Sequence, residues 1–116
     1  MKKNNLKKKD KTAITLKDKL TINNVGEIYS EFTNALSKVK KTTITFSNIT
    51  AIDISFIQLF CAFYRAAKEK NMQIEVDAPL KQEFHDYLIR TGFCTAGGER
   101  PECHEDCVQL LIRGNS

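Results

Sequence analysis

The stretch Asn48-Ile49-Thr50-Ala51-Ile52-Asp53-Ile54-Ser55-Phe56 decides how this chain folds, because it joins a strand-like segment to an apolar helix. Residues 42–47, just before it, alternate as a β-strand does, and residues 57–67, just after it, are almost wholly apolar. Asp53 therefore stands at the N-cap of a predicted helix, with Ser55 in its first turn. Because free backbone N–H groups and the positive end of the helix dipole lie there, we expect this turn to favour a phosphate group.

The segments on either side also alternate between strand-like and helix-like patterns. Residues 13–16 and 20–22 alternate around a charged turn, which predicts an early hairpin or a bent strand. Asn24 stands three residues before Glu27, as in a capping box, and opens a one-sided amphipathic helix. A strand at residues 72–76 and a third helix from Pro79 to Gly92 follow. This order predicts a single α/β domain whose mixed sheet of four or five strands is packed by helices.

The charge of the chain is concentrated in its first residues. Residues 1–11 hold six lysines and one aspartate, a net +5, so the remaining chain carries −1 of the total of +4. Such a block usually is a disordered, solvating segment, so we expect neither a nucleic-acid partner nor insertion into a membrane. With no apolar stretch of signal-peptide or membrane-span length, we expect a cytoplasmic protein. The predicted organisation is a tail at 1–11, a domain at 12–93 and a cysteine-containing extension at 94–116.

The four cysteines of the chain suggest a second hypothesis, a metal site near the C-terminus. Cys61 lies within the apolar helix and is interpreted as a core residue, and in a cytoplasmic protein the cysteines are expected to be thiols or metal ligands rather than disulfides. Three thiolates and an imidazole near the C-terminus would suit tetrahedral zinc, although the spacing is not a standard one. The alternatives are reactive thiols or a merely structural loop. The candidate zinc ligands are Cys94, Cys103, His104 and Cys107. The final apolar segment, 108–112, is expected to form an edge strand or a packed extension.

Residues 12–93 resemble the STAS domain family, which includes bacterial anti-sigma factor antagonists, accessory subunits of lipid transport and the cytoplasmic tails of anion transporters. The segment Ile52 to Phe60 is similar to the family's strand–Asp-Ser-Ser-Gly-Leu–helix motif, and Leu88 to Phe93 is similar to its helix end. The resemblance implies that Ser55 is the serine that a partner kinase phosphorylates and that Asp53 positions it. Two residues depart from the motif: Ile54 replaces its first serine and Phe56 replaces its glycine.

The resemblance implies a regulatory function rather than an enzymatic one. We expect a serine kinase or anti-sigma factor-like partner to bind the unphosphorylated Ser55 surface, with apolar anchors at Ile54, Phe56, Leu59 and Phe63. No catalytic residue is predicted, because Asp53 and Ser55 have no histidine nearby to act as a base. Two alternatives are open: an accessory subunit of a transporter or chemotaxis-type complex in which Ser55 is never modified, and a metal- or redox-sensing domain. Phe56, beside the predicted switch, favours the first of these.

Overall fold

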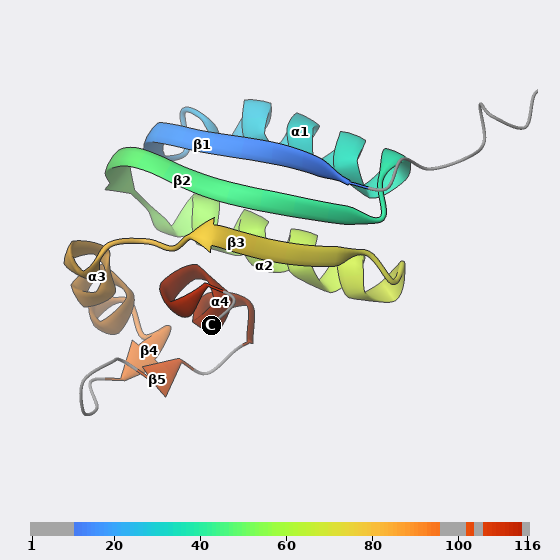
Figure 1. The fold of residues 1–116 in the computed structure, drawn as a ribbon. Helices are drawn as coiled ribbons and strands as arrows, with labels where there is room; N and C mark the ends of the chain where they lie inside the picture. The colour runs from blue at the N-terminus through green and yellow to red at the C-terminus, as the bar shows by residue number, and fades with distance from the viewer. Residues whose placement is uncertain (1–10, 96–101, 104–105, 115–116) are drawn as a thin grey trace, which may run out of the picture.

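Three parallel strands form the main sheet of the computed structural model, which describes residues 11–95, 102–103 and 106–114. The elements follow one another as β1 (Thr12–Leu20), α1 (Val25–Lys38), β2 (Lys41–Ile52), α2 (Ile54–Glu69), β3 (Gln73–Ala78), the 3-10 helix η2 (Gln82–Phe84), α3 (His85–Arg90), β4 (Cys94–Thr95), β5 (Glu102–Cys103) and α4 (Asp106–Arg113). The strand order is β1-β2-β3, and α1 and α2 cover the same face of the sheet (Figure 1).

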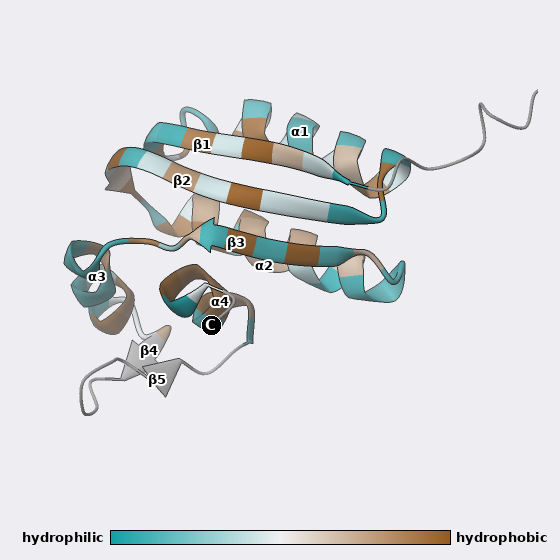
Figure 2. Ribbon diagram, in the orientation of Figure 1, coloured by the Kyte–Doolittle hydropathy of each residue, from teal (hydrophilic) through white to brown (hydrophobic). Residues whose placement is uncertain are grey.

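The sheet is hydrophobic on the face that the helices cover. Along β2, Thr42, Ile44 and Phe46 are buried, whereas the residues between them are only partly buried. Figure 2 shows the resulting alternation of hydrophobic and polar residues along the strands. The period of two residues therefore fixes which side of each strand meets the helices.

The sheet differs from the predicted one in both the number and the direction of its strands. Residues 13–16 and 20–22 do not form a hairpin: β1 runs through to Leu20 as one bent strand, with irregular register on both sides of Asp18. Asp18 has φ 65° and Asn48, near the matching bend of β2, has φ 53°, a region that Asp and Asn tolerate better than most residues. Because the chain bends without reversing, no antiparallel strand joins the main sheet among the described residues. The expectation of a mixed, four- to five-stranded sheet was wrong.

The last described segment is a helix rather than a strand. Residues 108–112 belong to α4, which lies beside α2 and β3 (Figure 1). Four of its side chains are buried at helical spacing: Cys107, Val108, Leu111 and Ile112. Strands β4 and β5 form a separate antiparallel two-stranded sheet, in which residue 94 pairs with residue 103 along the backbone. Since α4 supplies core residues, the hydrophobic core extends beyond residue 93.

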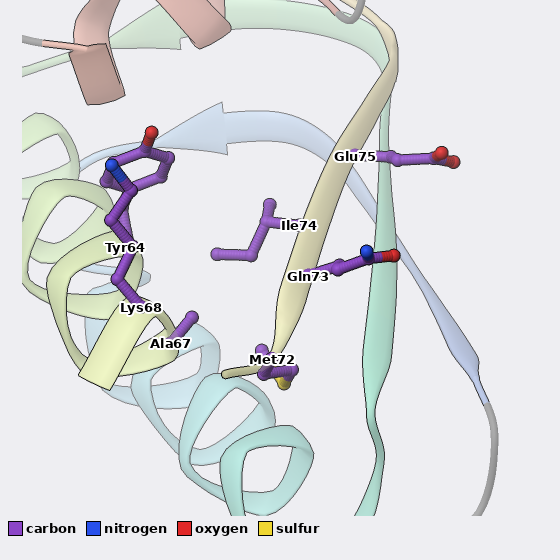
Figure 3. Close-up of a pocket in the computed structure, with 7 residues that line it drawn as sticks. All are labelled: Tyr64, Ala67, Lys68, Met72, Gln73, Ile74 and Glu75. Atoms are coloured by element: carbon purple, nitrogen blue, oxygen red, sulfur yellow. The ribbon is translucent and has the colours of Figure 1, made fainter. Parts of the chain in front are cut away.

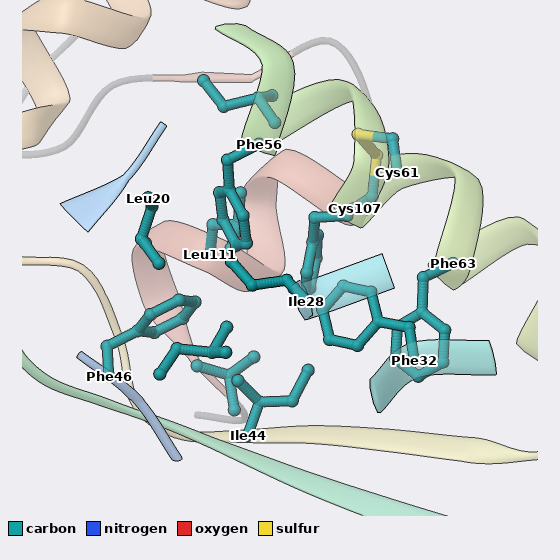
Figure 4. Close-up of a cluster of buried hydrophobic side chains, with 14 of the residues drawn as sticks. Leu20, Ile28, Phe32, Ile44, Phe46, Phe56, Cys61, Phe63, Cys107 and Leu111 are labelled. Atoms are coloured by element: carbon teal, nitrogen blue, oxygen red, sulfur yellow. A yellow bond between two sulfur atoms is a disulfide. The ribbon is translucent and has the colours of Figure 1, made fainter. Parts of the chain in front are cut away.

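Aromatic side chains dominate the core between the sheet and the helices (Figure 4). The ring of Phe32 in α1 stacks on that of Phe63 in α2, with centroids 4.1 Å apart and an interplanar angle of 10°. In the first turn of α2, the ring of Phe56 meets Phe46 of β2 edge-on, with centroids 6.1 Å apart. These contacts hold α2 against both α1 and the sheet, and so fix where its first turn stands.

Candidate functional site

The candidate site lies at the beginning of α2, where β2 ends and the loop after β1 passes close by. This is the edge of the sheet at which the carboxyl ends of the parallel strands meet, a common place for functional sites in α/β folds. The predicted residues Asp53, Ile54 and Ser55 lie together in this turn.

Asp53 is the N-cap of α2, as the sequence predicted. Its Oδ1 accepts hydrogen bonds from the backbone N–H of Ser55 at 2.9 Å and of Phe56 at 3.4 Å. Its Oδ2 accepts a third from the backbone N–H of Ile22 at 2.9 Å, and the Asp53 N–H donates to the carbonyl oxygen of Leu20 at 3.0 Å. One carboxylate therefore joins the loop after β1 to the start of α2.

These hydrogen bonds change the expectation that the first turn offers free N–H groups to a phosphate. The N–H groups of Ser55 and Phe56 already have the Asp53 carboxylate as their acceptor. A second anion beside these two N–H groups would meet a negative charge and donors that already have an acceptor. The turn, as it stands, does not form an open phosphate-binding site.

Ser55 is partly buried, and its hydroxyl has no hydrogen-bond partner among the residues that the structure describes. Two exposed isoleucines flank this turn: Ile54 is 43% exposed and Ile22 is 63% exposed. Ile22 was not singled out from the sequence, because its place in an alternating segment suggested an ordinary strand residue. The hydrogen bond from its N–H to Asp53 places it beside the turn. A turn that combines a polar hydroxyl with exposed apolar side chains is suited to contact with another protein.

Two of the predicted partner-binding residues are core residues instead. Phe56 is 0% exposed and Phe63 is 3% exposed, so the expectation that they are surface anchors was wrong. Their rings fill the space between α2, α1 and β2, where apolar burial stabilises the fold most. Phe56 therefore does not place a large ring on the surface beside Ser55.

Leu59 is partly buried and lines a mainly apolar groove of about 220 Å³ between α1 and α2. Tyr29, which is 59% exposed, lines the same groove from α1. Ala62 and Ala66, one turn apart on α2, leave it open because their side chains are short. Of the four predicted anchors, Ile54 and Leu59 thus remain accessible.

A second groove, of about 400 Å³, lies between α2 and the free edge of β3 (Figure 3). Lys68 places its Nζ 5.1 Å from the centre of the Tyr64 ring, and Ile74 projects toward α2. Glu75 points away from α2 and pairs with Lys41, Nζ to Oε2, at 2.9 Å. This larger groove is therefore distinct from the turn that carries Ser55.

The cysteines are arranged differently from the predicted zinc site. Cys107 forms a disulfide with Cys61 of α2, so its sulfur is not free to bind metal in this structure. The side chains of Cys94 and Cys103, and His104 as a whole, lie outside the described residues. Within the part that is described, no three His, Cys, Asp or Glu side chains gather as a metal site would require. The expectation that Cys61 is a core residue agrees with its 5% exposure, but the preference for thiols over a disulfide was wrong for this pair.

Residues 5–95 match the family model described as "Mlab, STAS domain". Because this match spans most of the 116 residues, the chain belongs to the STAS domain family. STAS domains are generally regulatory, non-enzymatic domains that act through protein–protein contacts. No curated protein and no solved structure matches the chain at a significant level. None of the helices in the described ranges is long and apolar enough to cross a bilayer.

Proposed function

We propose that this chain acts like an anti-sigma factor antagonist, in which a serine kinase or anti-sigma factor-like partner binds the surface around Ser55. Phosphorylation of Ser55 would weaken that contact. The observation that supports the proposal most is the Ser55 hydroxyl, which has no hydrogen-bond partner among the described residues, in a turn next to exposed Ile54 and close to exposed Ile22. The proposal places the domain in the bacterial cytoplasm, where its partner would regulate transcription.

The surroundings of Ser55 give phosphorylation a physical effect. A phosphate group adds about −2 charge, and the nearest backbone donors are already bound by the Asp53 carboxylate. These two N–H groups therefore already have an acceptor, and the new charge lies close to the like charge of Asp53. Pressing it against the apolar side chain of Ile54 within an interface would cost desolvation energy. The unphosphorylated form is accordingly the one that binds.

The same hydrogen bonds favour a second candidate function. If Asp53 serves only to hold the α2 turn in place, Ser55 need never be modified, and the domain would act as a constitutive accessory subunit of a transporter or chemotaxis-type complex. The surface formed by Ile22, Ile54 and Leu59 would then be the docking surface. Phosphate on Ser55 separates the two functions.

The test uses the full-length chain expressed with the proteins encoded beside its gene. Intact mass and peptide mapping should find phosphate on Ser55, and calorimetry with the co-purified partner should show Ser55→Ala binding as unphosphorylated wild type does. Ser55→Asp should bind about 1–3 kcal/mol more weakly, because an unpaired charge is buried at the contact.

Ser30→Asp is the matched control, because Ser30 is an exposed serine on α1 whose hydroxyl already bonds the Gly26 carbonyl oxygen. It adds the same charge away from the Asp53 turn and should leave affinity unchanged. Equal affinity for the wild type and both Ser55 variants, with no phosphate on the protein, would reject the switch and favour the accessory subunit.

A further inference from the structure

The disulfide between Cys61 and Cys107 joins two helices whose cysteines lie 46 residues apart in sequence. Both side chains are buried, at 5% and 2% exposure. In the described residues it is the only covalent bond between α4 and the rest of the domain apart from the chain itself. Figure 4 shows this bond beside the aromatic core, with Leu111 of α4 in the same cluster.

Apart from the disulfide, α4 is held by noncovalent packing and backbone hydrogen bonding. Val108 and Leu111 are 0% exposed, and the carbonyl oxygen of Leu111 accepts a hydrogen bond from the N–H of Leu80 at 2.9 Å. Helix α4 is short, with eight residues, and would not be stable in isolation. Whether it stays folded therefore depends on its attachment to α2 and β3.

The face of α2 that meets α4 continues to the candidate site. Cys61, which bonds to α4, lies one turn after Ile57, and Ile57 lies one turn after Ile54 on the same side of the helix. Ile57 is 0% exposed, whereas Ile54 is 43% exposed and adjoins Ser55. Along α2, the exposed Ile54 therefore comes first, and the buried part of the row begins one turn later at Ile57.

We propose that the Cys61–Cys107 disulfide is a redox-controlled clamp on α4. When the bond is intact, α4 remains docked and this row of α2 is covered as far as Ile57. When the bond is reduced, α4 can leave, and Ile57 and Cys61 join Ile54 in one exposed apolar strip beside Ser55. The domain then presents a different surface in its reduced and oxidised states.

The chemistry is thiol–disulfide exchange with a dithiol reductant of the thioredoxin class. A thiolate of the reductant attacks one of the two sulfurs, the bond between Cys61 and Cys107 breaks, and a mixed disulfide forms. The second thiol of the reductant resolves it, so the reductant ends as its own disulfide and supplies two electrons and two protons to the two cysteines. Since both sulfurs are buried, the exchange requires local opening of α4.

The clamp is independent of phosphorylation, and its test needs no partner. The full-length protein is prepared in air-oxidised form and after reduction with dithiothreitol, and amide hydrogen exchange is followed in α4 and β2. In the oxidised form the amides of α4 should be protected nearly as well as those of β2, because α4 cannot leave while it is tethered. After reduction, α4 should exchange about tenfold or more faster than β2, because it then opens separately.

Two variants separate this disulfide from the other cysteines. Cys107→Ala should behave as reduced protein with and without dithiothreitol, whereas Cys94→Ala with Cys103→Ala should keep the full response. If Cys107→Ala does not fold, the comparison of oxidised and reduced wild type decides alone. Peptide mapping that finds no bond between Cys61 and Cys107 in oxidised protein would overturn the proposal. So would exchange in which α4 and β2 remain equally protected after reduction.

Discussion

Replacing Asp53 by alanine removes three hydrogen bonds that converge on one carboxylate. Loss of the N-cap bonds to Ser55 and Phe56 costs about 1 kcal/mol. Loss of the bond from the Ile22 N–H, which lies near the surface, costs about 0.5–1 kcal/mol more. We therefore expect Asp53→Ala to lower the free energy of unfolding by about 2 kcal/mol. For a domain of this size that lowers Tm by roughly 8 °C.

The assay is thermal and urea unfolding followed by far-UV circular dichroism, with two comparison variants. Asp53→Asn keeps the Oδ1 acceptor but places an amide where Oδ2 accepts from Ile22, so it should lose about half as much. Asn24→Ala changes the N-cap residue of α1, whose side chain makes no capping hydrogen bond and instead accepts from the Thr21 hydroxyl. That change should cost about 0.5 kcal/mol or less. If Asp53→Ala is no more destabilising than Asn24→Ala, the carboxylate does not join the two segments as described.

Three further predictions concern packing. Phe56→Gly should lower the free energy of unfolding, measured in urea, by about 4 kcal/mol or more, because it removes a fully buried ring. Ile54→Ala changes an exposed position and should lower it by less than about 1 kcal/mol. Similar losses for the two variants would contradict the assigned burial. Leu111→Ala should lower the free energy of unfolding by about 2–4 kcal/mol in the same assay, because α4 belongs to the core. An unchanged free energy of unfolding would show that α4 does not belong to the core. Gly114→Ala should lower Tm, since its φ is 66° and a Cβ would lie 2.9 Å from a carbonyl oxygen of β3. Gly26→Ala in α1, with open space around it, should leave Tm unchanged or raise it.

The sequence alone determined the features that depend on neighbouring residues. Asp53 precedes a long apolar helix, and a short acidic side chain at that place caps the helix whatever the rest of the fold does. The alternation in residues 42–47 and the helical spacing after Asn24 likewise identified β2 and α1. The capping box expected at Asn24 did not form, because the side chain of Asn24 bonds Thr21 instead. The buried positions of α4 also have helical spacing, so a closer interpretation of that period would have identified the helix.

Only the tertiary structure decided which side of the apolar helix α2 is exposed. A helix that is apolar nearly all round does not show which face is buried, and here that depends on α1, β2 and the distant α4. For this reason Phe56 and Phe63 were mistaken for surface anchors. Ile22 was missed because its own segment looked like an ordinary strand. The bond from Ile22 to Asp53 spans 31 residues and the disulfide spans 46. No local period encodes such contacts, because they arise only when the folded chain brings remote segments together.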